Sequence, residues 1–433
     1  MTDSPPSAEA APPRSRSRSW ARPVLFRVMA LVLSLGPCLL VLEIVVRHYV
    51  EVDADGNQHI RGARLLPFRL PVERTRRQAA KLAEGKSPCF RYDPELGWAP
   101  RPVTACHGGL YVYDRAGIRS NRRRRNPPRT REPGVLRVGL FGDSFTHGDG
   151  VAIEDSWGQL LEDGLRHWGI EARVLNFGVG GYGLDQALLR WRKQGAAFEL
   201  DVVILGFQSE NVLRDTNMIR ALYWWRTQLP FTKPRFVLEG DELVVRNQPA
   251  VSPDELPALL ESLPSWPLVE HEGFYDPDDF EPRWWQASRV LGYLAGWRAH
   301  EVGTLENPAQ ERYYVPGSPS YELTLRLLDQ LEREVEDAGA ELLVVHLPKA
   351  IDWQRRAEGR PLWYAALRDE IARRHQWVET EPGFDAAVER DPGVVLFDSG
   401  GHYTFEGNVA IADVLRELLR DRARRAAEPA DRP

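Results

Sequence analysis

The chain has 433 residues, which is enough for two or three domains or for one large domain with insertions. Its formal net charge of −6 gives no indication of nucleic acid as a main partner. Three cysteines exclude a scaffold held together by disulfides, and no Cys/His cluster offers a metal set. We expect neither a metal nor a cofactor.

The N-terminal part reads as a leader followed by a membrane anchor. Residues 1–23 are rich in Pro, Ser and Arg, which predicts a disordered cytoplasmic leader. Residues 24–47 form an apolar segment long enough to span a bilayer, and the preceding arginines predict a periplasmic or extracellular location for the rest of the chain. A cleaved signal peptide and a buried soluble helix are the alternatives. Glu43 and Arg47 have the spacing of an ion pair at the outer interface.

Residues 48–134 are expected to form a stalk and an accessory segment. Residues 48–86 are charged and mostly helix-forming, with little core. The basic loop 122–131 is interpreted as a solvated connection or as a binding site for an acidic polymer or a lipid headgroup. In an exported protein, Cys89 and Cys106 lie in an oxidising space and can form a disulfide; two unrelated buried thiols are the alternative.

From residue 135 onward, apolar runs alternate with amphipathic helical patterns. This alternation indicates a parallel sheet with helices on both faces. We therefore predict one α/β domain over 135–425 and a disordered tail over 426–433. The predicted strands lie in the runs 135–142, 172–179, 201–208 and 341–348.

An interruption at about 216–320 is too long for an ordinary loop. It contains 233–249, a predicted hairpin that turns at Glu239-Gly240-Asp241. It also contains four tryptophans, Trp224, Trp225, Trp284 and Trp285. We interpret this insertion as a lid or substrate platform over the active edge of the sheet, or as a structural subdomain with its own small core.

Four residues of chemical interest follow the predicted strands or precede the last helix. Ser144, Gly181 and Asn211 come after the first, second and third runs, and His402 lies just before the final helix. Ligands of open parallel sheets bind beyond the carboxyl ends of the strands. A nucleophilic serine requires an imidazole base, and a developing oxyanion requires donors already in place. These residue types fit those roles.

This ordered set resembles the SGNH hydrolases, also called the GDSL esterase family. Gly142-Asp143-Ser144 with Phe145-Thr146 is similar to the first block of the family, and Gly181, Asn211 and His402 match the later blocks. The resemblance covers about 135–215 and 340–420. The apolar segment, 93-DPELGWAPRP-102, 117-GIRSN-121 and the hairpin 233–249 extend it to a membrane-anchored bacterial branch.

The resemblance implies a three-layer α/β/α, flavodoxin-like fold and a serine esterase. In such an enzyme Ser144 attacks the ester carbonyl and His402 is the base. The Ser144 N–H, the Gly181 N–H and the Asn211 amide form the oxyanion hole. The family acid lies three or two residues before the histidine, at Ser399 or Gly400 here. We expect Asp398, four residues before, to orient His402 instead; another acid or a backbone carbonyl is the alternative.

Further residues are assigned to the pocket or to structure. Asp143 is expected to cap the following turn or to line the pocket. His147 is expected on the pocket wall or at the surface, and Tyr403 on the pocket wall. His346 is interpreted as a core or rim histidine. Glu210 is also placed in the pocket, at a position where the family usually has Gly.

The expected substrate is an O-acyl group on a cell-surface glycan or a lipid. One alternative is a periplasmic O-acyltransferase for an exopolysaccharide that uses the same residues. The other is a catalytically weak or inactive scaffold of an envelope assembly, which the displaced acid and Glu210 favour.

Overall fold

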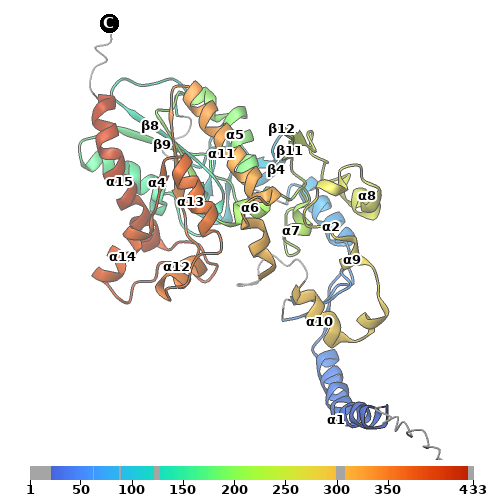
Figure 1. Ribbon diagram of the computed structural model, residues 1–433. Coiled ribbons are helices and arrows are strands. Elements are labelled where there is room, and N and C mark those ends of the chain that lie inside the picture. The colour runs from blue at the N-terminus through green and yellow to red at the C-terminus, as the bar shows by residue number, and fades with distance from the viewer. Residues whose placement is uncertain (1–20, 62, 87–88, 121–126, 299–307, 428–433) are drawn as a thin grey trace, which may run out of the picture.

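The computed structural model describes residues 21–427 except 62, 87–88, 121–126 and 299–307. A sheet with helices on both sides forms the larger body, at the upper left of Figure 1. Helices α2, α8, α9 and α10 lie to one side of this body, and α1 extends away from them. The predicted leader and tail, and part of the basic loop, fall mainly outside the described residues.

The central sheet has five parallel strands in the order β14-β13-β10-β8-β9. Its strands are β8 (Leu136–Phe141), β9 (Ala172–Asn176), β10 (Val202–Phe207), β13 (Glu341–His346) and β14 (Trp377–Val378). All six residues of β8 and of β10 are buried, as expected for strands covered on both faces. The chain adds β9 on one side of β8 and β10 on the other. The sheet is therefore flavodoxin-like, with its topological switch point between β8 and β10.

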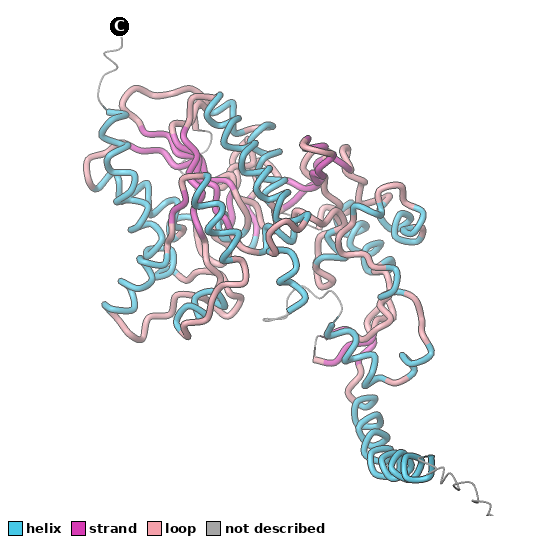
Figure 2. The backbone as a smooth tube through the Cα atoms, viewed as in Figure 1, coloured by secondary structure: helices cyan, strands magenta, loops and turns pink. Residues whose placement is uncertain are grey.

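Helices cover both faces of this sheet, which gives the expected three layers (Figure 2). One face carries α4 (Trp157–His167), α14 (Glu381–Arg390) and α15 (Phe405–Ala427). The other face carries α5 (Leu184–Lys193), α11 (Pro319–Asp337) and α13 (Ala365–Arg374). In α11 the buried stripe Leu325, Leu328, Leu331 and Val335 has helical spacing. Each such side chain contributes roughly 1.5–3 kcal/mol by leaving water.

The apolar N-terminal segment forms α1 (Ala21–His48). Arg47 and Glu43 form the expected ion pair at 2.7 Å. Glu43 also accepts hydrogen bonds from the Ser288 hydroxyl and the Arg289 N–H, at the start of α10 (Arg289–Arg298). Across the described part of the chain, no helix combines the length and apolar character needed to cross a membrane.

The segment after α1 is less helical than its composition predicts. Three short antiparallel strands, β1 (Glu51–Val52), β2 (Gln58–Ile60) and β3 (Ala63–Arg64), precede the one helix α2 (Val72–Ala83). Asp53 closes the first turn because its carboxylate accepts from the N–H groups of Asp55 and Asn57. Two further hairpins follow: β4 (Phe90–Asp93) with β5 (Gly97–Pro100), and β6 (Ala105–Cys106) with β7 (Tyr111–Val112). Cys89 and Cys106 form a disulfide.

The insertion shares the core of the main body. The predicted hairpin is present as β11 (Arg235–Glu239) and β12 (Glu242–Arg246), with Gly240 in the turn at φ 62°. The short helices α7 (Arg220–Tyr223), α8 (Leu256–Glu261) and α9 (Pro277–Phe280) flank it. Phe236, Leu256 and Phe274 belong to the same buried cluster as the strand residue Leu205. The interpretation as a subdomain with its own small core is therefore wrong.

Candidate active site

Ser144 stands where β8 meets a short helix, α3 (Ser144–His147). Gly142 precedes this turn with φ 147°, and a Cβ there would lie 2.3 Å from the Thr146 hydroxyl and 2.9 Å from the Gly206 carbonyl. Only glycine fits this close approach between β8, α3 and β10. Asp143 caps α3, because its side chain accepts from the Phe145 N–H at 2.9 Å. The turn therefore presents Ser144 at the switch point of the sheet.

His402 reaches Ser144 from the loop that precedes α15. Its Nε2 lies 2.9 Å from the Ser144 Oγ, although 258 residues separate the two in sequence. The Phe145 ring lies 4.9 Å from the imidazole, centroid to centroid. The pair has the geometry in which an imidazole can take the proton of an attacking hydroxyl.

Two backbone N–H groups beside this pair are available as oxyanion donors. Among the described residues, neither the Ser144 N–H nor the Gly181 N–H has a hydrogen-bond acceptor. Gly181 lines the same cavity as Ser144 and His402 and has φ 81°. Free donors held next to a nucleophile are what a developing oxyanion requires.

Asn211 does not occupy the position that the resemblance implies. Its Nδ2 donates to the Asp143 Oδ2 at 3.3 Å and to the Tyr182 carbonyl at 3.2 Å, and its side chain does not line the cavity. Its Oδ1 accepts from the Gln208 N–H at 2.7 Å. Asn211 therefore fixes the β10 loop and the Asp143 carboxylate, because both amide hydrogens already have acceptors inside the protein.

Asp398 contacts the backbone of the His402 loop. Its Oδ1 accepts from the Gly400 N–H at 2.7 Å and from the His402 N–H at 3.0 Å. Within the described residues no hydrogen bond joins its carboxylate to the His402 ring. The extra residue between the acid and the histidine turns this carboxylate toward the loop backbone, so Asp398 holds the loop that carries His402.

Asp149, which the sequence reasoning did not single out, is a carboxylate that lines the same cavity as His402. Its Oδ1 lies 2.5 Å from the His147 Nδ1, and the His147 Nε2 lies 2.9 Å from the Tyr113 hydroxyl. Burial raises the pKa of Asp149, but His147 and then His402 lower it below its usual value. The sequence signal that could have identified Asp149 is its position five residues after Ser144, in the same glycine-rich turn.

His147 supports Asp149 and does not line the cavity. Burial, with Arg119 nearby, lowers the pKa of His147 to about 4, so its imidazole is neutral at pH 7. A neutral ring can donate from Nδ1 to Asp149 and accept at Nε2 from Tyr113. The expectation of a wall position is therefore corrected for His147. It is corrected also for Tyr403, which is buried and donates to the Pro348 carbonyl at 2.8 Å.

Glu210 belongs to an ionic network along the other side of the cavity. Arg214 donates to the Asp143 Oδ2 and to Glu210, each at 2.6 Å. Lys349 and the Tyr223 hydroxyl also donate to Glu210, each at 3.0 Å. Despite burial, Lys349 and Arg214 hold the pKa of Glu210 well below its usual value. Glu210 lines the cavity, whereas Asp143 does not.

The cavity has a volume of about 470 Å³ and combines this polar machinery with apolar walls. The insertion contributes to it, which supports its interpretation as a platform at the active edge. The lining residues from the insertion are Arg220, Tyr223, Trp224 and Leu229, and those from the β13 side are Lys349, Ala350, Ile351 and Trp363.

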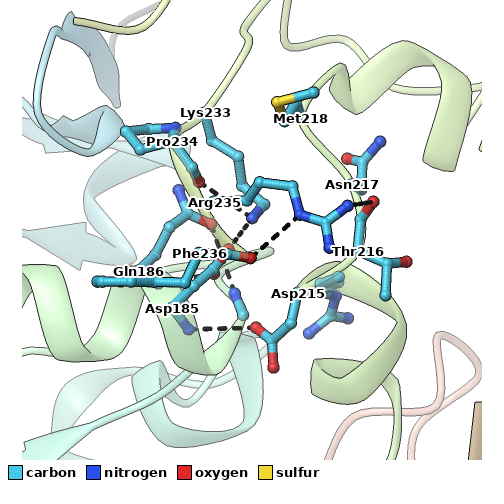
Figure 3. Close-up of polar contacts among 12 residues, drawn as sticks. Asp185, Gln186, Asp215, Thr216, Asn217, Met218, Lys233, Pro234, Arg235 and Phe236 are labelled. Carbon is cyan, nitrogen blue, oxygen red and sulfur yellow. Dashed lines mark hydrogen bonds and ion pairs between the residues drawn. The ribbon is translucent and has the colours of Figure 1, made fainter. Parts of the chain in front are cut away.

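A buried polar cluster ties the insertion to the loop that carries Gly181 (Figure 3). Lys233, from the hairpin segment, forms an ion pair with Asp185 at the start of α5, and both side chains are buried. The Asp215 Oδ1 accepts from the Asp185 N–H at 3.1 Å. Burial, and then Asp185, raise the pKa of Asp215 well above its usual value. A Cβ on Gly183 would lie 2.4 Å from Asp215, so this cluster packs directly under the glycine-rich loop.

Two groups of metal-ligating side chains occur in the described residues. In the first, Cys89 and Cys106 are bonded to each other beside His107, so no thiolate is available. In the second, the His346 Nδ1 lies 3.0 Å from Glu379 and 2.9 Å from Glu381. Burial lowers the pKa of His346, but these carboxylates outweigh burial and raise it to about 9. We interpret this group as a buried ion pair.

Comparison with known proteins adds little to this geometry. No family model and no curated protein matches the chain. Its fold is similar to that of a lipase/acylhydrolase from Enterococcus faecalis, with 14% identity, a TM-score of 0.33 and coverage of 66% of this chain and 96% of the other. A GDSL-like lipase from Bacteroides thetaiotaomicron has 11% identity and a TM-score of 0.29, with coverage of 66% of this chain and 88% of the other. An acetylxylan esterase from Geobacillus stearothermophilus has 13% identity and a TM-score of 0.31, with coverage of 66% of this chain and 93% of the other. Values this low carry no argument for function, which rests on the site itself.

Proposed function

We propose that the chain is a serine ester hydrolase of the SGNH type. The observation that carries this proposal is the 2.9 Å contact between the His402 Nε2 and the Ser144 Oγ, inside a cavity that two free N–H donors adjoin. Support for acyl chemistry comes from the combination of nucleophile, base and oxyanion donors, which acyl transfer requires and a non-catalytic scaffold does not.

In the proposed reaction the Ser144 oxygen attacks the ester carbonyl while His402 takes its proton. The N–H groups of Ser144 and Gly181 stabilise the oxyanion. The alkoxide then leaves with the proton from His402, and an acyl group remains on Ser144. Water attacks this acyl-enzyme with His402 again as base, which releases the carboxylic acid. A sugar hydroxyl in place of water would make the same residues an O-acyltransferase.

We propose residues 24–47 as a membrane anchor that places the catalytic domain outside the cytoplasm. The disulfide between Cys89 and Cys106 supports an oxidising compartment. Trp284 is 89% exposed, and tryptophans are frequent at membrane–water interfaces. It lies near the end of α1, because the carbonyl of the nearby Ala287 accepts a hydrogen bond from Arg47 at 2.9 Å. Both observations support a membrane surface at this end of α1. The proposed substrates are O-acyl groups on cell-surface glycans or lipids.

A fluorophosphonate probe tests the enzyme proposal, because it reacts only with an activated serine. The detergent-solubilised full chain should be labelled at Ser144, and Ser144→Ala should not be labelled. Ser399→Ala, in the exposed part of the His402 loop, is the matched control and should be labelled like the wild type. Absence of labelling on folded wild-type protein, beside a labelled reference esterase, would refute the proposal.

A further inference from the structure

Arg220, the first residue of α7, is a cation that lines the cavity and forms no ion pair with any residue that the structure describes. Its guanidinium packs directly on Gly181, since a Cβ on that glycine would lie 2.8 Å from its Cζ and both Nη atoms. Its one hydrogen bond within the described residues is a 3.5 Å contact from Nη1 to the Gly181 carbonyl. Its Nε is buried without an acceptor. Hydrogen-bonding capacity at this guanidinium is therefore unused.

The two other cations that line the cavity already have carboxylate partners. Arg214 is shared by Asp143 and Glu210, and Lys349 is bonded to Glu210. Asp149 accepts a hydrogen bond from the neutral His147, and its Oδ2 lies beside Gly180, where an added Cβ would be 3.4 Å away. No carboxylate among the described residues lies within ion-pair distance of Arg220. Burial, and then Arg214, lower the pKa of Arg220 to about 10 although Tyr223 and the Glu210 carboxylate raise it, so the group is still charged at neutral pH.

Arg220 is half-buried and its Nε is buried without an acceptor, so an anionic ligand would satisfy hydrogen-bonding capacity that the free protein leaves unused. The planar guanidinium is suited to a carboxylate, which it can bind through two parallel hydrogen bonds. Its place against Gly181, whose N–H is a free oxyanion donor, puts such a carboxylate within a few bonds of the ester carbonyl. The apolar walls from Trp224, Leu229 and Trp363 would surround the rest of the ligand.

We propose that Arg220 forms an anion subsite, and that the enzyme acts on esters that carry a carboxylate close to the scissile bond. This inference rests on the ester hydrolase function proposed above. The carboxylate can belong to the acyl part, as in a dicarboxylic acid hemiester, or to the alcohol part, as in an acylated uronic acid. In both cases a carboxylate would bind the Arg220 guanidinium. Substrates that carry the carboxylate on only one of the two parts distinguish the acyl part from the alcohol part.

A structural role is the competing explanation. The Arg220 guanidinium also lies 5.4 Å from the Trp98 ring centroid, so it could simply brace Gly181 against that ring. Such a brace would affect stability and the activity on every ester, but it would not select anionic over neutral substrates. The selectivity ratio therefore separates the two roles.

The test uses two pairs of esters on the full-length wild type, Arg220→Gln and Arg220→Lys. One pair is phenyl hemisuccinate and its neutral methyl ester; the other is an O-acetylated methyl galacturonoside and its neutral methyl ester. Wild type should prefer the anionic member of one pair by about tenfold to a hundredfold, the range for a hydrogen-bonded charge. Arg220→Gln should lose this preference, and Arg220→Lys should retain part of it.

Arg226→Gln is the matched control, because Arg226 is exposed outside the cavity and its substitution removes the same charge. It should keep the wild-type ratio. Circular dichroism should show that each variant is folded. Equal rates for both members of both pairs, or an unchanged ratio in Arg220→Gln, would overturn the subsite.

Binding to Ser144→Ala, measured by calorimetry with the same four compounds, separates this inference from the proposed function. Anion-selective binding that Arg220→Gln abolishes supports the subsite even if the wild type hydrolyses nothing. Hydrolysis of the neutral esters without anion-selective binding contradicts the subsite and leaves the hydrolase standing.

Discussion

The imidazole of His402 and the hydroxyl of Ser144 are in hydrogen-bond contact at 2.9 Å, although they come from opposite ends of the catalytic domain. Ser144 follows the first strand of the sheet, and His402 precedes the last helix. The contact requires the whole parallel sheet to be formed, because only then do the two loops meet at one edge. The proposed ester hydrolysis is thus tied to the fold of the sheet domain.

Removing either member of this pair should abolish most of the activity. We expect Ser144→Ala and His402→Ala each to lower kcat/KM on p-nitrophenyl acetate by about 10³-fold or more, because nucleophile and base act as one unit. The double variant should be little worse than either single one. His167→Ala, an exposed histidine at the end of α4, should retain full activity. Additive losses in the double variant would argue against the pair.

The two candidate carboxylates near His402 should differ in their effect on rate. Asp149 lines the cavity with His402, which lowers its pKa, so its charge can stabilise the imidazolium in the transition state. Asp398 instead accepts from backbone N–H groups, which an asparagine oxygen can also serve. We therefore expect Asp149→Asn to lower kcat by about 10- to 100-fold and Asp398→Asn to lower it less. Steady-state kinetics on one ester checks the order, and a larger loss in Asp398→Asn would identify Asp398 as the residue that orients His402.

Breaking the buried pair between Lys233 and Asp185 should destabilise the protein strongly. Lys233→Met leaves the Asp185 carboxylate buried without a cation, which costs about 3–5 kcal/mol. Urea denaturation followed by tryptophan fluorescence should show a clearly lower midpoint. Lys81→Met, an exposed lysine in α2, should leave the midpoint unchanged. Equal midpoints for both variants would mean that the cluster of Figure 3 contributes nothing to stability.

Stability should depend on pH through the buried ion pair of His346. The pKa of His346 is raised to about 9 in the folded state, so its contribution is complete below the unfolded value near 6.5 and is lost as pH rises through 9. The pKa of Glu379 is lowered to about 2, with burial opposing and His346 as the main lowering cause. Its contribution is present above the unfolded value near 4.5 and is lost as pH falls toward 2.

Thermal unfolding of wild type and His346→Gln over pH 5 to 10 checks this prediction. The difference in Tm between the two proteins should be largest near pH 5–6 and should shrink as the pH approaches 10. His375→Gln, in the separate cluster with Glu332, controls for a general effect of removing a buried histidine. A difference that is constant with pH would show that His346 is not charged in the folded state.

Much of the fold could be predicted because its signals are local. The apolar runs of β8, β9, β10 and β13 are long enough to be recognised as buried strands, and the glycine before Asp241 identifies the hairpin. Residues 48–86 are charged and mostly helix-forming in composition, which predicts helices. The turn closed by the Asp53 carboxylate instead favours short strands there. The two-residue strand β14 has no apolar run of its own, since its pairing with β13 depends on a partner distant in sequence.

The sequence by itself determined that Ser144, Gly181 and His402 meet at one edge of a parallel sheet, because the order of strands and helices places their loops there. Only the tertiary structure decided how each side chain is partnered. It assigned the Asn211 amide to Asp143, turned Asp398 to the loop backbone and placed Asp149 in the same cavity as His402. It also left the Arg220 Nε without an acceptor among the described residues. Hydrogen bonds act over about 3 Å, so a shift of one residue in a loop changes the partner without changing the pattern that predicts the fold.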